Sequence, residues 1–488
     1  MKHVTPEQAG ISSRHVLAFY KELAQRQLST HAVILSRGDT LFSEQYYAPF
    51  HRNFLHRMYS TSKSFVSLAI GFCEQDGLLC LEDPLYKFFP EYKSKPYLHP
   101  TTIREMLQMT TTQPQMPSWF TSGTKDRAGY YFEYPPTKHP GTLFHYDSAG
   151  SFMLGAVVEN LTGKPFFTYL REKVLNDIGF SEDAYCLQCP GGHSWGDSGV
   201  MCTARDLWRF ARFVLNGGTW GGKRYLNEAY LRAATTPAVA NTAYGFGSAG
   251  DIFGYGYQFW GAPQGCFATL GMGNQISLCD PAHDFIMVMN ADNQGNKNSY
   301  DQIYGALYRH VIGNLGAPLP PDPEAQAELA AYLAAQKLFC LPGDTESAFA
   351  DRIRGRVFDC EESATGIKWF RLDIQGDGGS FTYENARGEK CISFGFGRNV
   401  FEKFPQEGYS DLVGTVPVAG HRYDAACSAD WPAAQTLRVR VQIIDKYFGN
   451  LGILFGFRDE NTVSVLFEKK AEHFLDEYQG IVNAVARN

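Results

Sequence analysis

Residues 59–71 read YSTSKSFVSLAIG, a cluster of small polar residues that runs directly into an apolar stretch. On a helix, Ser60 and Lys63 would lie about one turn apart on the same face. The apolar run after Lys63 predicts a largely buried helix from about Ser60 to Gln75. The segment therefore places a serine and a lysine together where a buried helix begins.

That pairing has a chemical use. A serine hydroxyl becomes a competent nucleophile when a neighbouring base takes its proton. Burial beside an apolar helix disfavours the ammonium form of a lysine, which can then act as that base. The N–H groups and the partial positive charge of a helix N-terminus suit an oxyanion. Alternatively, Ser60 is only an N-cap and Lys63 a surface residue, and this segment alone does not separate the two interpretations.

The S-x-x-K spacing by itself is weak evidence, because it occurs twice in this chain. Ser122-Gly123-Thr124-Lys125 is a second match and lies in a polar segment rich in turns. No apolar helix follows it, so we interpret the second copy as chance. The rest of the chain must decide whether the first copy is functional.

Residues 1–315 have the pattern of an α+β domain. An opening helix is expected from about Ser13, and apolar runs on both sides of Arg37-Gly38-Asp39 predict a β-hairpin. Further helices are expected at 147–161, after Thr203 as N-cap, and from Ser299, with strands at 254–260, 266–280 and 285–290. Helices between an early hairpin and late strands predict one antiparallel sheet assembled from both ends of the domain.

The composition changes after residue 315. Four prolines in GAPLPPDPE predict a linker, which we extend with an Ala-rich helix to 316–338. Residues 339–488 form short strands between turns, which predicts a small all-β sandwich or barrel. In TLRVRVQII (436–444), apolar and polar residues alternate, so one strand face is expected to be buried. Nothing in this domain has catalytic spacing, and packing beside the cleft or homodimer contacts are left open.

Charge, hydropathy and cysteine usage exclude several classes. A net charge of −7 argues against a nucleic-acid partner, and no run of about 18 apolar residues predicts a membrane span. The N-terminal residues lack the apolar core of a signal peptide, so we expect a cytoplasmic protein whose eleven cysteines are reduced. Cys186 and Cys189 form a C-x-x-C near His193, but the flanking Pro-Gly-Gly indicates a loop. We therefore expect a structural role there, and neither a metal nor a cofactor.

Two more motifs give the first one its context. FHYDSAGSFMLG (144–155) places Tyr146 and Ser148 just ahead of a second apolar helix, and FATLGMG (267–273) reads as a strand. Together with S-x-x-K they follow the order of active-site elements in the serine β-lactamase and penicillin-binding-protein-like superfamily. Over about residues 5–315 the chain closely resembles the class C-like esterase and amidase branch of that superfamily.

The resemblance implies roles for the residues at these positions. Ser60 would be the acylated nucleophile and Lys63 its base or base-orienting partner. Tyr146 takes the place of the family's loop tyrosine, which shares proton transfer with the lysine and protonates the leaving group. Ser148 stands where many members have asparagine and would orient the lysine or hydrogen-bond the substrate. His145 adjoins the tyrosine, but its spacing implies no role.

The strand motif departs from the family pattern. Thr269-Leu270-Gly271 occupies the place of K-T-G, and the backbone N–H of Met272 would complete an oxyanion hole with that of Ser60. Threonine instead of lysine removes a fixed cation from the site that holds a substrate carboxylate, which disfavours an anionic β-lactam or a peptide C-terminus.

We therefore expect a metal-independent serine hydrolase that cleaves a small ester or amide. The aromatic-rich segment 117–134 and Trp195 suggest an apolar, partly aromatic substrate pocket. Two alternatives remain at this point: β-lactamase or D,D-peptidase activity, including a D-aminopeptidase-like one, or a non-catalytic binding module that retains the fold.

Overall fold

A computed structural model describes residues 1–114, 116, 124–242, 252–472 and 474–487. The chain divides into two compact units, Met1–Lys337 with Asp411–Gly414, and Leu338–Ser410 with Thr415–Asn488. Among the described residues, no helix has both the length and the apolar character needed to cross a membrane.

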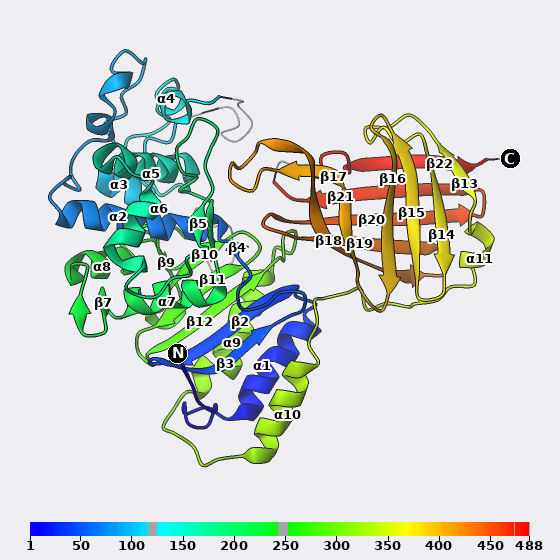
Figure 1. Ribbon diagram of the computed structural model, residues 1–488, viewed down its shortest axis with the longest axis horizontal. Coiled ribbons are helices and arrows are strands. Elements are labelled where there is room, and N and C mark those ends of the chain that lie inside the picture. The colour runs from blue at the N-terminus through cyan, green and yellow to red at the C-terminus, as the bar shows by residue number, and fades with distance from the viewer. Residues whose placement is uncertain (115, 117–123, 243–251, 473, 488) are drawn as a thin grey trace. The chain divides into compact units, whose positions relative to one another are not determined.

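The first unit is built on a seven-stranded sheet with the strand order β1-β3-β2-β12-β11-β10-β9 (Figure 1). Its strands are β1 (Lys2–His3), β2 (Thr30–Arg37), β3 (Thr40–Tyr46), β9 (Trp260–Gly261), β10 (Phe267–Gly271), β11 (Gln275–Asp280) and β12 (Phe285–Ala291). β1 runs parallel to β3, and the other neighbours are antiparallel. Because β2 pairs with β12, the N-terminal hairpin lies beside the last strands, and the predicted sheet from both ends of the domain is confirmed.

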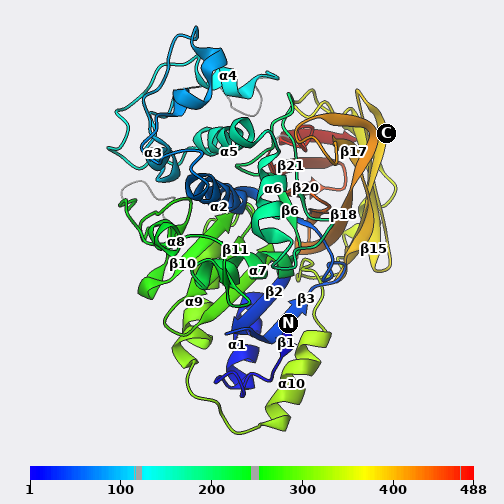
Figure 2. The same ribbon diagram turned by 60° about the vertical axis from the view of Figure 1, so that its left-hand side comes forward.

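Helices cover both faces of this sheet. The helices α1 (Ser13–Gln25) and α9 (Ser299–His310) pack together on one face with α10 (Pro323–Ala334) along α1, and α7 (Ala204–Leu215) contacts the opposite face (Figure 2). Val33 and Leu35 belong to the core shared with α1 and α9. Ser36, which points the other way, accepts a hydrogen bond of 2.7 Å from Trp208 Nε1 on α7. A sheet covered on both faces explains why β2 is buried along nearly its whole length.

Beyond α7 lies a group of helices that carries two of the three predicted motifs, the third being on β10. They are α2 (Ser62–Gln75), α3 (Ile103–Leu107), α4 (Arg127–Tyr131), α5 (Ser148–Thr162), α6 (Phe166–Leu170) and α8 (Glu228–Thr235). The short strands among them are β4 (His56–Arg57), β5 (Tyr185–Cys186), β6 (Val200–Cys202), β7 (Thr219–Trp220) and β8 (Lys223–Arg224). α2 contacts α5 and α6, and twelve of its residues from Ser62 to Cys73 are buried, as its apolar sequence predicts.

The strand predicted at 254–260 is wrong for all but its last residue. Only β9 forms a strand here, and Tyr255 makes isolated bridges, because Gly254 and Gln258 adopt positive φ angles of 87° and 62° and bend the chain. The buried Gln258 side chain donates to the carbonyl oxygens of Met106 and Leu107, at 3.1 and 2.9 Å. It therefore satisfies backbone acceptors in the last turn of α3 instead of pairing within a sheet.

The second unit is a closed β-barrel. Its strands are β13 (Val357–Cys360), β14 (Trp369–Gln375), β15 (Gly378–Asn385), β16 (Gly388–Phe396), β17 (Val400–Tyr409), β18 (Pro417–Ala433), β19 (Thr436–Ile444), β20 (Phe448–Asp459), β21 (Thr462–Lys470) and β22 (Gly480–Ala486), with the short helix α11 (Ala350–Ile353). The ten strands form one sheet, and a parallel pairing of β16 with β18 closes it. In β19, Leu437, Val439, Val441 and Ile443 are fully buried, which confirms the buried face, whereas Gln442 on the predicted polar face is buried as well.

Candidate active site

Ser60 lies in η1 (Tyr59–Thr61), a single 3-10 turn that leads into α2. The α-helix therefore begins at Ser62, two residues later than predicted. Tyr59, which precedes the serine, has a φ of 46°, in the left-handed region that costs a non-glycine residue about 1–3 kcal/mol. The surrounding contacts must hold this conformation.

The small polar side chains of the 59–71 stretch supply those contacts. Thr61 Oγ1 donates to the carbonyl oxygen of Gln275 at 3.2 Å, and Ser62 Oγ accepts from the Val200 N–H at 2.9 Å. One turn of chain is thereby tied to strand β11 and to strand β6. Both contacts come from residues distant in sequence, so tertiary structure fixes the position of Ser60.

Lys63 is buried, with 2% of its surface exposed. Its Nζ lies 3.2 Å from Ser60 Oγ, 2.7 Å from the carbonyl oxygen of Asp197, and 5.0 Å from the centroid of the Tyr146 ring. The alternative of a surface lysine is therefore wrong. A buried amine within hydrogen-bond distance of a serine hydroxyl has the geometry required for proton transfer between them.

Asp197 is a member of the site that the sequence did not indicate. Asp197 is 1% exposed, and its side-chain Oδ1 atom has no hydrogen-bond partner within the described part of the chain. Burial raises the pKa of its carboxyl group, and the positive charges of Lys63, Arg127 and Arg57 oppose that rise. No motif or spacing distinguishes this aspartate, since its charged neighbours come from distant segments.

Arg57 holds the segment that carries Asp197. It is fully buried and donates from Nε to the carbonyl oxygen of Ser198 at 3.0 Å and from Nη2 to Ser198 Oγ at 2.7 Å. Its guanidinium lies 4.3 Å from the centroid of the Trp195 ring.

Trp195 itself has 0% exposure, because its neighbours enclose it completely. The prediction that it lines the substrate pocket is therefore wrong. Residues 117–123 of the predicted pocket wall, and Ser122 and Gly123 of the second S-x-x-K copy, lie outside the described residues.

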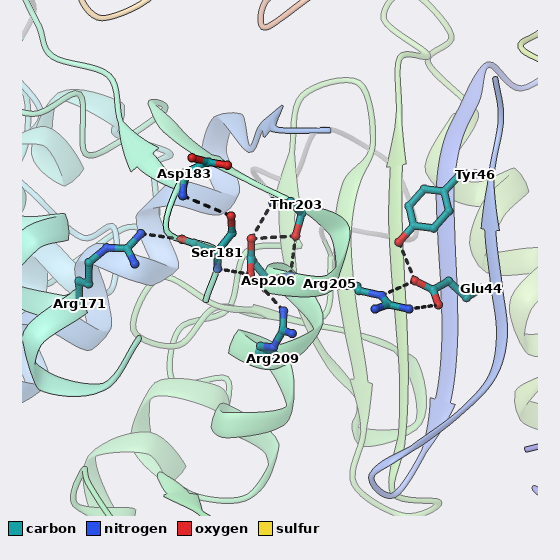
Figure 3. Close-up of polar contacts among 9 residues, drawn as sticks. All are labelled: Glu44, Tyr46, Arg171, Ser181, Asp183, Thr203, Arg205, Asp206 and Arg209. Carbon is teal, nitrogen blue, oxygen red and sulfur yellow. Dashed lines mark hydrogen bonds and ion pairs between the residues drawn. The ribbon is translucent and has the colours of Figure 1, made fainter. Parts of the chain in front are cut away.

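The segment that carries Asp197 is anchored at its C-terminal end, where α7 begins (Figure 3). Thr203 and Asp206 form a capping box, in which each side chain accepts from the other's backbone N–H at 3.1 Å. Asp206 Oδ1 also accepts from the Ser181 N–H at 2.9 Å. Arg205 binds both carboxylate oxygens of Glu44 on β3, at 2.6 and 2.7 Å. The chain from Asp197 into α7 is thus attached to the central sheet.

Tyr146 lies one residue before the N-cap of α5. Asp147 caps the helix by accepting from the Gly150 N–H at 2.9 Å and also accepts from Thr111 Oγ1 at 2.6 Å. The Tyr146 ring stacks on Trp260, with 5.7 Å between centroids. Ser148 is the half-buried first residue of α5, and within the described residues its side chain makes no hydrogen bond to Lys63. The tyrosine is therefore held in place on both sides.

Strand β10 passes directly beside Ser60. Thr269 is 2% exposed, and its hydroxyl contacts Ser277 Oγ at 2.8 Å and Thr61 Oγ1 at 3.4 Å. A Cβ atom at Gly271 would lie only 2.3 Å from the carbonyl oxygen of Met58. Glycine is therefore required for this close approach of β10 to η1.

Met272 follows Gly271 and is half-buried. Within the described residues, neither the Met272 N–H nor the Ser60 N–H donates a hydrogen bond to the protein. The structure thus brings Ser60, Lys63, Tyr146 and the end of β10 together.

The C-x-x-C loop has protein partners of its own. Cys189 Sγ accepts a hydrogen bond from Arg127 Nη1 at 3.0 Å, and burial raises the pKa of the Cys186 and Cys189 thiols. His193 pairs with Glu159 at 2.7 Å, and this hydrogen bond raises the pKa of the imidazole. Across the described ranges of the chain, no cluster of three or more His, Cys, Asp or Glu side chains could hold a metal ion.

Comparisons with known proteins agree with this geometry. Residues 17–310 match the family model for beta-lactamase, which covers more than half of the chain. The chain belongs to the beta-lactamase family. It is 27% identical over 290 residues to a 6-aminohexanoate-dimer hydrolase of Paenarthrobacter ureafaciens, covering 55% of this chain and 74% of that protein. It is 23% identical over 257 residues to a beta-lactamase of Yersinia enterocolitica, covering 47% of this chain and 63% of that one.

Solved structures show the same fold. EstCE1, a hydrolase with promiscuous acyltransferase activity, superimposes with a TM-score of 0.50 at 18% identity, covering 61% of this chain and 98% of that chain. A Bacillus anthracis protein assigned to the 6-aminohexanoate-dimer hydrolases gives a TM-score of 0.52 at 21% identity, covering 64% and 85%. The first unit therefore has the mixed α/β fold of β-lactamases.

Proposed function

We propose that the chain is a serine hydrolase that cleaves a small ester or amide through an acyl-enzyme on Ser60. The observation that carries this proposal is the position of Lys63, whose buried Nζ lies 3.2 Å from Ser60 Oγ with the Tyr146 ring beside it. Membership of the beta-lactamase family and relatives named as hydrolases support it.

The proposed reaction follows from these positions. Lys63 accepts the proton of Ser60 as its Oγ attacks the substrate carbonyl carbon. The N–H groups of Ser60 and Met272 stabilise the oxyanion that forms. Tyr146, sharing the proton with Lys63, protonates the departing alkoxide or amine. A water molecule then attacks the acyl-enzyme with the same groups in reverse roles and regenerates Ser60.

The strand residue Thr269 favours a substrate without a carboxylate at that position. Its hydroxyl is already engaged by Ser277, and it carries no charge with which to hold an anionic β-lactam. The Paenarthrobacter ureafaciens relative is named for the hydrolysis of a 6-aminohexanoate dimer, and EstCE1 is described as a hydrolase with acyltransferase activity. The first name supports a small amide substrate, and the second supports chemistry that transfers an acyl group.

The proposal is tested by covalent labelling of Ser60 and by turnover of an ester substrate. With a p-nitrophenyl ester we expect burst kinetics, and with a fluorophosphonate a stable adduct on Ser60. Ser60→Ala should abolish the adduct and lower turnover by about 10³–10⁶-fold. Ser122→Ala, in the second S-x-x-K copy, is the matched control and should behave as wild type. Turnover that survives Ser60→Ala would overturn the proposal.

A substrate panel separates the alternatives. It should contain p-nitrophenyl esters, linear amides of ω-amino acids, D-amino acid amides and nitrocefin. Nitrocefin is included because one relative, from Yersinia enterocolitica, is named as a beta-lactamase. Efficient nitrocefin turnover would favour β-lactam hydrolysis over hydrolysis of a small ester or amide. Absence of any adduct on Ser60 would instead favour a binding module that retains the fold.

A further inference from the structure

The peptide between Gly271 and Met272 is held at one end and free at the other. The Gly271 carbonyl oxygen accepts a hydrogen bond of 3.0 Å from the Tyr300 hydroxyl and one of 3.1 Å from the Asn274 N–H. The Met272 N–H, at the other end of the same peptide, has no protein acceptor within the described residues. The two ends of this unit thus have different surroundings.

Peptide geometry couples these two ends. The bond is trans, and in a planar trans peptide the C=O and N–H groups point in opposite directions. Fixing the Gly271 oxygen therefore also fixes the direction of the Met272 N–H. That direction matters because an oxyanion donor acts only when it is aimed at the developing charge before reaction.

The local chain needs such a constraint. The ladder between β10 and β11 ends at the Gly271–Gln275 pair, so Met272 lies beyond the last regular pairing. Gly273 has a φ of 76° and Asn274 a φ of 74°, which makes a tight turn directly after it. Glycine leaves the peptide on its C-terminal side unusually free to rotate, and a second hydrogen bond limits that freedom.

Tyr300 is suited to impose the constraint. It is the second residue of α9, a helix that packs against α1. It is half-buried, packs against the core of the first unit, and its ring makes an edge contact with Tyr304 at 6.4 Å between centroids. Its hydroxyl therefore comes from a rigid element 29 residues away in sequence.

We propose that Tyr300 is a positioning residue, which holds the Gly271 carbonyl so that the Met272 N–H faces the oxyanion formed at Ser60. The catalytic consequence rests on the proposed function, whereas the orientation of the peptide does not. Tyr300 need not touch the substrate to act in this way.

Tyr300→Phe tests this by removing one hydroxyl and keeping the ring. We expect kcat for ester hydrolysis to fall about tenfold with KM nearly unchanged, less than the ~10²–10³-fold cost of losing an oxyanion donor outright. Fluorophosphonate labelling of Ser60 should slow by a similar factor. Tyr308→Phe is the matched control, because Tyr308 also lies on α9 and donates its hydroxyl to a carbonyl oxygen, that of Pro263 at 2.8 Å. It should leave kcat unchanged.

A second readout does not depend on activity. In protein labelled with ¹⁵N-methionine, the amide signal of Met272 is assigned as the one that is lost in a Met272→Leu variant. Loss of the hydrogen bond to the preceding carbonyl should move the Met272 signal in Tyr300→Phe and not in Tyr308→Phe. A stationary Met272 signal overturns the positioning role even if the wild type proves inactive. A moved signal with an unlabelled Ser60 would instead refute the proposed function alone.

Discussion

Lys63 and Asp197 are joined by a short hydrogen bond, in which Nζ donates to the backbone carbonyl oxygen at 2.7 Å. The two residues are 134 positions apart in the chain. Arg57 fixes the carbonyl's segment through Ser198, and that segment continues into the capped start of α7. The lysine that contacts Ser60 is therefore held by a separate, well-anchored part of the fold.

Replacing Lys63 by methionine should remove the base while filling much the same space. We expect kcat/KM for a p-nitrophenyl ester to fall by about 10²–10⁴-fold, the usual contribution of a positioned proton-transfer group. Circular dichroism should show an unchanged fold. Lys125→Met, at the lysine of the second S-x-x-K copy, controls for loss of a positive charge. Near-normal turnover by Lys63→Met would contradict its role as base.

Removing the hydroxyl of Tyr146 should affect substrates according to their leaving groups. Tyr146→Phe keeps the stack on Trp260 but cannot deliver a proton. Since p-nitrophenolate leaves without protonation, we expect a modest loss with that ester and a loss of about 10²-fold or more with an alkyl amide. Steady-state rates on both substrates measure the difference. Tyr255→Phe is the control, because the Tyr255 ring also contacts Trp260. Equal losses of activity on both substrates in Tyr146→Phe would refute a leaving-group role for Tyr146.

Adding one methyl group at Gly271 should damage the site through sterics alone. A Cβ there would lie 2.3 Å from the Met58 carbonyl oxygen, so β10 and η1 must separate. We expect Gly271→Ala to lower the free energy of unfolding by about 1–3 kcal/mol and to slow labelling of Ser60 strongly. Gly305→Ala is the control: this helical glycine has open space around it, and alanine there should stabilise α9 by about 0.5–1 kcal/mol. A neutral Gly271→Ala would show that the approach is not tight.

Acid should destabilise the fold through two buried histidines. Burial lowers the pKa of His56 to about 3 and that of His99 to about 4, from 6.5. Between pH 6.5 and those values the unfolded chain binds the extra protons, so the free energy of unfolding falls with falling pH, by about 1.4 kcal/mol per unit for each histidine.

Urea titrations at pH 6 and pH 5 measure this dependence. His56→Phe keeps a ring between Phe50 and Phe54 and removes one titrating group, so the loss of stability between the two pH values should be smaller than in wild type. His139→Gln, at an exposed position, should lose as much stability as wild type. If His56→Phe and wild type lost the same free energy of unfolding between pH 6 and pH 5, the low pKa of His56 would not be a source of the acid sensitivity.

Much of the fold could be predicted from the sequence, because its signals are local. The helix that starts at Ser13, the hairpin around Gly38 and the Thr203 cap follow from side-chain periodicity and turn chemistry, and the structure confirms each. The strand expected at 254–260 failed because Gln258 bonds to α3, a partner that periodicity within one segment does not reveal.

In the candidate site, too, some features follow from local sequence and others from tertiary contacts. The sequence by itself determined that Ser60 and Lys63 share a face, since a spacing of three residues on a helical turn fixes that relation locally. Only the tertiary structure decided that Lys63 is buried against Asp197 and that Tyr300 reaches Gly271. Those contacts depend on where separate elements meet when the sheet and its helices pack, and that arrangement minimises exposed apolar surface over the whole unit.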